Sequence, residues 1–387
     1  MTKYFKAPLL FLGLLVSLGP LNASESSDKP CQTSDDHTPF QNLLESKERR
    51  LETGVELLVF TSTISSIFSD AQVLLDEAFG TDNSAQIFRN KVESIDPDYD
   101  AGLSVYFKYH PSRLMNTIGL SYSYIHSDGD GHLNQENSTF IPLTNVTQTT
   151  EQHDKGSQHT HLHIANLTIE KSLPITPYFL INLQTGMAFH SFHYSFDLQN
   201  QLDVTQVTGF GGAIVGIQNV NISANEKGNF YGVGPNIGVQ FDFALFSPNS
   251  CHDLNFVGMT NFGFICARDS LEGSLSYNKR LLINGQDTGS NSSYITWKNP
   301  SVTHFIPNIN LDFKLQYRWH HIHRSSISLI LSLGYRFISY WNVDQTGRRV
   351  CALNGDETPS LQDYTIYPRD IEDFGYCGPY LRIGVGF

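Results

Sequence analysis

Charged residues alternate with apolar or small residues in several stretches of this chain. Side chains two positions apart in a β-strand share a face, so these charges lie opposite the apolar residues. Around a lumen, rings of charge would bias the passage of ions. In a narrow lumen the same charges would pair with one another instead. The candidate pore-lining residues are Glu56, Asp100, Lys108, Asp242, Asp312, Lys314, Arg318, Arg336 and Arg382.

Histidine, a common metal ligand, is concentrated in two groups. The first is His159, His161 and His163, with His153 nearby; the second is His320, His321 and His323. Imidazoles at a period of two can bind a transition metal. No cysteine or acidic residue completes either group at a recognisable ligand spacing. We therefore expect these histidines to be polar residues of strand ends and turns. No metal and no other cofactor is expected.

Residues for nucleophilic catalysis form no recognisable motif. Serine, histidine and aspartate all occur within 127–158 and 267–303, but a triad is recognised by its geometry. The sequence contains no Gly-x-Ser-x-Gly motif. We expect a protein that is not an enzyme.

The carboxy-terminal stretch is the clearest of the elements that must position these side chains. Apolar residues occupy every second position from Pro379 to Phe387, and Tyr, Arg or Gly lie between them. A transmembrane β-barrel needs such a last strand to pair with its first strand, because an open edge cannot be satisfied in lipid. The terminal Phe387 resembles the sorting signal of bacterial outer-membrane proteins.

Nine further stretches alternate in a similar way. The ten predicted strands cover residues 52–60, 98–110, 117–125, 159–171, 179–189, 231–245, 254–266, 305–319, 327–337 and 378–387. Strands of about ten residues with aromatic ends match a tilted membrane crossing better than the shorter strands of soluble proteins. The pattern predicts an all-β fold, an up-and-down antiparallel transmembrane β-barrel of about ten strands. Hairpins within 193–228 or 267–303 would raise the number to twelve.

The connections between these strands alternate in length. Short turns are expected on the periplasmic side, and long loops at 63–97, 127–158, 193–228, 267–303 and 342–372 on the extracellular side. The first of these loops has room for one helix near residues 69–79. The strand at 159–171 changes face halfway, and a β-bulge near Ala165 and Asn166 would restore its apolar residues to one side.

The five cysteines are an odd number for an exported chain. Cys351 and Cys377 bracket the last long loop, whereas Cys31 and Cys251 fall on the opposite side. These two pairs are topologically allowed disulfides, with Cys266 left over. The alternative is that the thiols are unpaired and partly buried.

The amino-terminal region indicates export. Lys3 and Lys6 precede an apolar run that ends near a plausible cleavage site at Ala23, so residues 1–23 are expected to be a cleaved signal peptide. Residues 24–50 then form a periplasmic tail and residues 51–387 the barrel. The net charge is −13, and the sequence shows no basic face of the kind that binds nucleic acid, so a nucleic-acid partner is not expected. The predicted location is the outer membrane of a Gram-negative bacterium.

Three glycine-rich stretches resemble a known family. They are the segments at 99–103, 230–238 and 373–381, which read YDAGL, FYGVGPNIG and DFGYCGPYL. In this order, with the terminal strand, they are similar to the Legionella-type major outer membrane proteins, which also occur in chlamydia-related bacteria. The resemblance runs from about Leu51 to Phe387 and implies a pore-forming protein. One departure is Phe60, where the family would have a tryptophan.

The sequence thus leaves three functional hypotheses. The first is a small or gated channel for ions or small solutes. The second is a surface structural or adhesin-like barrel whose extracellular loops bind host or neighbouring cells, and the third is a secreted soluble β-sandwich. The expected partners are outer-membrane lipid, the permeating solute, the barrel assembly machinery through the strand ending in Phe387, and a second copy of the chain if it is an oligomer.

Overall fold

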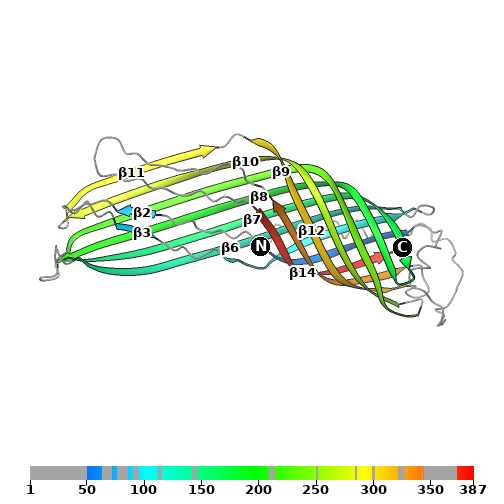
Figure 1. Cartoon of the computed structure of the whole chain (residues 1–387). Coiled ribbons are helices and arrows are strands. Elements are labelled where there is room, and N and C mark those ends of the chain that lie inside the picture. Colours follow the sequence, from blue (N-terminus) through cyan, green and yellow to red (C-terminus); the bar gives the residue numbers. More distant parts are fainter. Residues whose placement is uncertain are drawn as a thin grey trace.

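The structure, a computed structural model of the chain, is an all-β protein built around one closed barrel (Figure 1). It describes residues 50–62, 72–75, 86–89, 96–111, 116–141, 146–208, 214–249, 252–283, 286–298, 301–320, 327–341, 343 and 373–387. No helix in these ranges is long and apolar enough to cross a membrane.

Ten antiparallel strands close the barrel. They are β1 (Arg50–Ser62), β5 (Asp100–His110), β6 (Asn116–Ile141), β7 (Val146–Thr176), β8 (Phe179–Thr208), β9 (Ile214–Asn249), β10 (His252–Ile283), β12 (Val302–Trp319), β13 (Ser328–Trp341) and β14 (Asp373–Gly386). Each pairs with the next in this order, and β14 pairs with β1. The predicted strand number and up-and-down order are confirmed.

The first and last strands meet along a seam. Leu51 and Phe387 exchange two backbone hydrogen bonds, at 3.1 and 2.7 Å, and the register continues from Glu52 opposite Gly386 to Ser62 opposite Tyr376. No strand edge remains open between β14 and β1, as a barrel in lipid requires. We call the end of the barrel that carries this pair the proximal end, and the opposite end the distal end.

The outer surface of the barrel is apolar. Residues that alternate along the strands are half exposed although they are large and hydrophobic, among them Ile237 (63%), Leu333 (62%) and Ile383 (51%). A soluble monomer rarely exposes one apolar patch of more than a few hundred Å². The runs at 305–319 and 381–387 face outward as predicted, so the alternative of a soluble sandwich with these runs in its core is wrong.

Five strands continue far beyond the barrel. At the distal end β6 to β10 extend together and β11 (Gln286–Lys298) adds to β10, forming an open sheet that projects from the barrel (Figure 1). The prediction of long loops at 127–158, 193–228 and 267–303 is therefore wrong for most of these residues. Residues 209–213 lie outside the described ranges. These segments are mostly polar, although Val220 and Ile222 are buried. Few of them show the full alternation that marks a lipid-facing strand.

The connection at 63–97 also contains strands. Here β2 (Gln72–Leu75) and β3 (Gln86–Arg89) pair with each other, and β4 (Asp96–Pro97) pairs with β6. The helix expected near residues 69–79 is therefore wrong at β2.

The predicted β-bulge in β7 is absent from the described pairing. The register of β7 with β6 and β8 runs without a shift through Ala165 and Asn166. Leu162 and Ile164 are instead buried inside the barrel, while Leu167 and Ile169 face outward. The apolar residues change face because the distal part of the lumen is itself apolar.

Candidate functional site in the barrel interior

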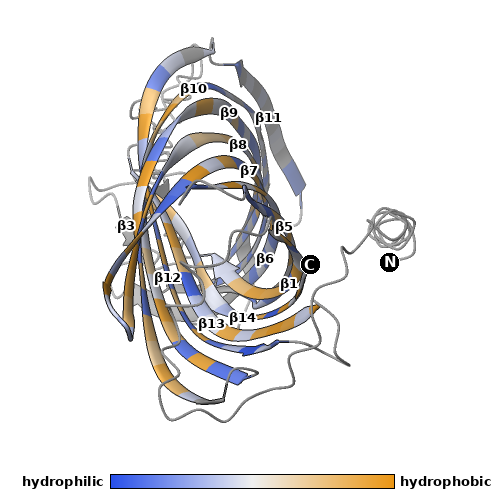
Figure 2. Cartoon of the chain, turned by 90° about the vertical axis from the view of Figure 1, so that its right-hand side faces the viewer, coloured by the Kyte–Doolittle hydropathy of each residue, from blue (hydrophilic) through white to orange (hydrophobic). Residues whose placement is uncertain are grey.

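Side chains from ten strands fill the barrel interior, because every second residue of each strand points inward. Figure 2 looks along the barrel and shows the strands as a ring, with hydropathy alternating along each ribbon. The interior has two layers, a polar layer toward the proximal end and an apolar layer toward the distal end.

A buried ion network forms one part of the polar layer. Glu56 on β1 lies between two arginines: the Arg336 guanidinium is 3.0 Å from one carboxylate oxygen, and Arg382 donates to the other. Arg336 also donates two hydrogen bonds to Asp312, at 2.7 and 3.0 Å. The Tyr380 hydroxyl donates a hydrogen bond of 2.5 Å to Asp312. Four strands, β1, β12, β13 and β14, are thereby joined.

The tyrosines of this network lie against the arginines. The Arg336 guanidinium is 4.8 Å from the ring centre of Tyr380, and that of Arg382 is 4.5 Å from the ring centre of Tyr106. Gly334 leaves room for Tyr380, since a Cβ there would lie 2.6 Å from the ring. These contacts add cation–π attraction to the ion pairs and leave little space between the side chains.

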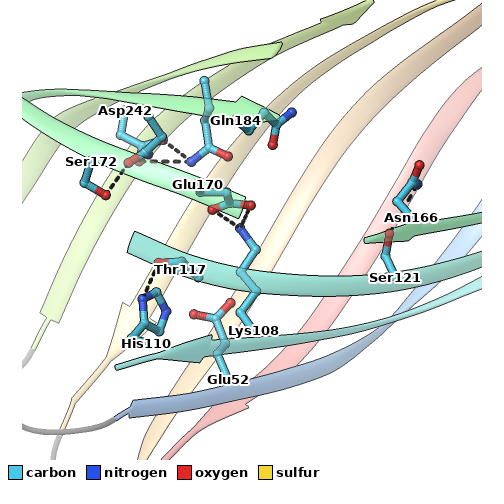
Figure 3. A network of polar contacts seen from close by, with 12 residues as sticks. Glu52, Lys108, His110, Thr117, Ser121, Asn166, Glu170, Ser172, Gln184 and Asp242 are labelled. Atoms are coloured by element: carbon cyan, nitrogen blue, oxygen red, sulfur yellow. Dashed lines mark hydrogen bonds and ion pairs between the residues drawn. The ribbon is translucent and has the colours of Figure 1, made fainter. Parts of the chain in front are cut away.

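Two further ion pairs lie nearer the proximal end. Lys108 on β5 donates to both carboxylate oxygens of Glu170 on β7, at 2.9 and 3.0 Å (Figure 3). Arg318 on β12 lies 3.2 Å from Glu52 on β1. Glu52 and Glu170 are absent from the predicted set. The sequence signal for Glu170 is its even spacing from Leu162 and Ile164, which the expected bulge obscured.

The opposite wall carries amide and carboxylate groups. Asp242 on β9 accepts hydrogen bonds of 2.9 Å from Asn182 and of 2.8 and 3.0 Å from Gln240. Gln184 on β8 donates to Asn261 on β10. Lys314 is buried inside the barrel, on the same strand as Asp312.

Asp100 differs from the other eight predicted residues. Its carboxylate accepts a 2.7 Å hydrogen bond from the backbone N–H of Asp128, where β5 parts from β6 at the distal end. The structure therefore brings eight of the nine predicted residues into the polar layer and places Asp100 at the rim. Whether any of them lines a path for ions stays a prediction.

An apolar cluster closes the lumen above the polar layer. Its aromatic members are Phe60, Phe192, Phe230, Tyr340, Phe374, Tyr376 and Tyr380, and aliphatic side chains such as Leu58, Ile125, Leu162, Ile306 and Ile338 surround them. We call this set the aromatic layer. The sequence pattern did not predict this layer, because inward positions were expected to be polar.

The aromatic layer spans the full width of the barrel. Phe192 on β8 stacks on Phe374 on β14 with ring centres 4.2 Å apart, and four strands separate β8 from β14 on either side of the ring. His190 on β8 likewise lies 2.7 Å from the Tyr340 hydroxyl on β13. Side chains of opposite walls are therefore in contact across the lumen at this level. The ion pairs below join neighbouring strands or strands at most three apart.

The two described cysteines lie on the outer face and form no disulfide with any described residue. Cys266 is exposed and Cys377 is partly exposed between outward-facing neighbours of β14. The predicted disulfide between Cys351 and Cys377 stays a prediction, because Cys351 is not among the described residues. Cys31, Cys251 and Cys351 lie outside the described residues, and the pair of Cys31 with Cys251 stays a prediction.

The two histidine groups lie at opposite ends of the barrel. The first is on the outer face of β7 at the distal end, with His153 further along the same strand. In the second group, His320 lies 2.8 Å from Asp253 near the proximal end, and His321 and His323 lie outside the described residues.

Comparison with known proteins matches most of the chain to a family of outer-membrane proteins. The family model described as Legionella pneumophila major outer membrane protein precursor matches residues 49–387. No curated protein matches.

Two similar solved structures have sequences very different from this chain. The outer membrane protease OmpT from Escherichia coli is 9% identical, covering 87% of this chain and 96% of that chain, with a TM-score of 0.29. A mutant of the monoaromatic hydrocarbon channel TodX is 6% identical, covering 90% and 92%, with a TM-score of 0.24. At these scores neither carries an argument about function.

Proposed function

Because this chain belongs to the Legionella major outer membrane protein family, we propose that its outer-membrane barrel is a narrow, gated channel for ions or small solutes. The observation that carries the proposal is the aromatic layer above a charged interior. Hydrophobic constrictions gate channels by excluding water. The structure would then represent the closed state, and separation of Phe192 from Phe374 would open it.

The charges of the polar layer set the expected selectivity. Five basic residues, Lys108, Lys314, Arg318, Arg336 and Arg382, face five acidic ones, Glu52, Glu56, Glu170, Asp242 and Asp312. Because these charges balance, we expect weak discrimination between cations and anions.

Planar-bilayer recording of the purified full chain tests the channel. We expect brief, small conductance steps from the native protein. The double variant Phe192→Ala/Phe374→Ala removes the stacked pair and leaves the strands unchanged, so it is expected to stay open longer and conduct more. Phe189→Ala is the matched control, because Phe189 is on the same strand but faces outward. Silence from the native protein and the double variant alike would refute the channel.

The projecting sheet favours a second candidate, a surface protein that binds other cells. Strand β7 has 31 residues, whereas about 9–11 residues cross a membrane. The remainder would reach on the order of 60 Å beyond it. Replacing residues 132–155 by a short turn would remove the tip of the β6–β7 ribbon. Loss of cell binding with unchanged conductance would assign the sheet this separate role.

A further inference from the structure

We propose that the outer rim of the barrel holds a divalent transition-metal ion such as Zn²⁺. The ligands are His126 and Asp128 on β6, His159 on β7 and Asp100 on β5. His161 positions His126 from behind.

Strand pairing brings His126, Asp128, His159 and His161 together on the outer face. The register places His126 directly opposite His161 and Asp128 directly opposite His159. Side chains directly opposite each other in an antiparallel pair have Cβ atoms about 5 Å apart. The His-x-His run of β7 therefore gains an imidazole and a carboxylate from a strand that lies more than 30 residues away in sequence.

The distances suit an ion held by Asp100, His126 and Asp128, with His159 on the other carboxylate oxygen of Asp128. One oxygen of Asp128 lies 3.0 Å from Nε2 of His126, and the other lies 2.8 Å from Nδ1 of His159. Ligand atoms of Asp100, His126 and Asp128 all fall within 4.8 Å of one another. Zn²⁺ binds imidazole nitrogen and carboxylate oxygen at about 2.0–2.2 Å, so tetrahedral ligand atoms lie about 3.3 Å apart.

Neighbouring groups hold the ligands in place. Nδ1 of His126 faces Nδ1 of His161 at 3.1 Å, and the Tyr124 hydroxyl lies 3.0 Å from the same His161 nitrogen. A partner on the second ring nitrogen fixes the orientation of a metal-binding imidazole. Asp100 is held by the Asp128 backbone N–H.

The site is open to ions and chemically selective. The side chains of His126, Asp128 and His159 are 29%, 42% and 45% exposed, so an ion can enter from the distal side. Two imidazoles with two carboxylates suit zinc, copper or nickel better than the oxygen-only ligand sets of calcium or magnesium.

Calorimetric titration of the folded full chain with Zn²⁺ in detergent tests the proposal. We expect one tight equivalent, distinct from weak binding to other histidines. His126→Asn and Asp128→Asn are expected to weaken it by at least the 10–100-fold that loss of an outer-shell partner costs. His161→Asn is expected to weaken it within that range.

His304→Asn is the matched control, since His304 lies 3.8 Å from Asp269 as a separate histidine–aspartate pair. Unchanged affinity in His126→Asn and Asp128→Asn would overturn the site, and so would equal weakening in the control. If the variants do not fold, histidine modification of the native chain decides. Zn²⁺ is then expected to protect His126 and His159 but not His304, and equal modification would overturn the proposal.

Discussion

Removing the charge of Glu56 tests whether water is excluded from the polar layer. The variant Glu56→Gln keeps the shape of the side chain and removes its charge. Glu56 is 2% exposed in its side chain, and Arg336 and Arg382 are 8% and 11% exposed. In the variant Arg336 still contacts Asp312, whereas Arg382 keeps only the tyrosine rings among the contacts described above.

The expected cost follows from this loss. Removing one partner of a buried pair destabilises by about 3–5 kcal/mol because a charge is left uncompensated. The remaining contacts of both arginines place the estimate at the low end. We expect Glu56→Gln to lower the free energy of unfolding by about 3 kcal/mol, roughly 150-fold in the equilibrium constant.

Urea unfolding of the barrel in lipid vesicles measures this difference. The control is Asp287→Asn, which breaks an exposed pair with Arg280 in the projecting sheet and is expected to cost less than about 1 kcal/mol. The double variant Glu56→Gln/Arg382→Met removes both charges and is expected to recover part of the loss. A cost below about 1 kcal/mol, with additive double-variant energies, would show that water already solvates this layer. The closed-lumen interpretation would then fail.

Three further predictions concern the wall of the barrel. Leu333→Arg puts a charge on the lipid face near mid-membrane and is expected to destabilise the barrel by about 2–4 kcal/mol. The folded band that shifts on heating should become weaker on gels. Normal assembly of this variant would mean that this face does not contact lipid. Gly334→Val places a side chain against Tyr380 and is expected to lower the free energy of unfolding in urea by about 1–3 kcal/mol. The control is Gly289→Val, where a Cβ has no atom within 4 Å, and it is expected to leave the stability unchanged. Cys266 is exposed near the distal end, so we expect a membrane-impermeant maleimide to label it on intact cells. The Cys266→Ser variant should not be labelled at this position. Labelling only after lysis would place the distal end on the periplasmic side.

Lipid contact made most of the barrel predictable from sequence. The outer face of each strand must be apolar and the inner face need not be, so the alternation from Phe305 to Trp319 fixes both the strand and its orientation. The projecting sheet has water on its faces and no such requirement. Its strands therefore read as polar loops, and only the pairing of β6 with β7 and its neighbours reveals them.

The interior was harder to predict because inward side chains contact residues that are distant in sequence. Glu56 alternates visibly, but its contact with Arg382 joins positions 326 residues apart. The aromatic layer reverses the expected polarity of the inner face, which is why Leu162 and Ile164 were assigned to the wrong side. The histidine and carboxylate groups at the rim are likewise separated in sequence and meet only through strand register.

The seam between β1 and β14 constrains how the molecule can be assembled. Thr53 pairs with Val385, more than 300 residues later, so the first strand has no permanent neighbour on that side until the last one arrives. Such distant pairing forms slowly because the loop-closure entropy comes first. A chain stopped before β14 would hold two bare edges, and each unmet amide in hydrocarbon costs several kcal/mol. Insertion must therefore wait for the whole chain or proceed beside a surface that shelters both edges.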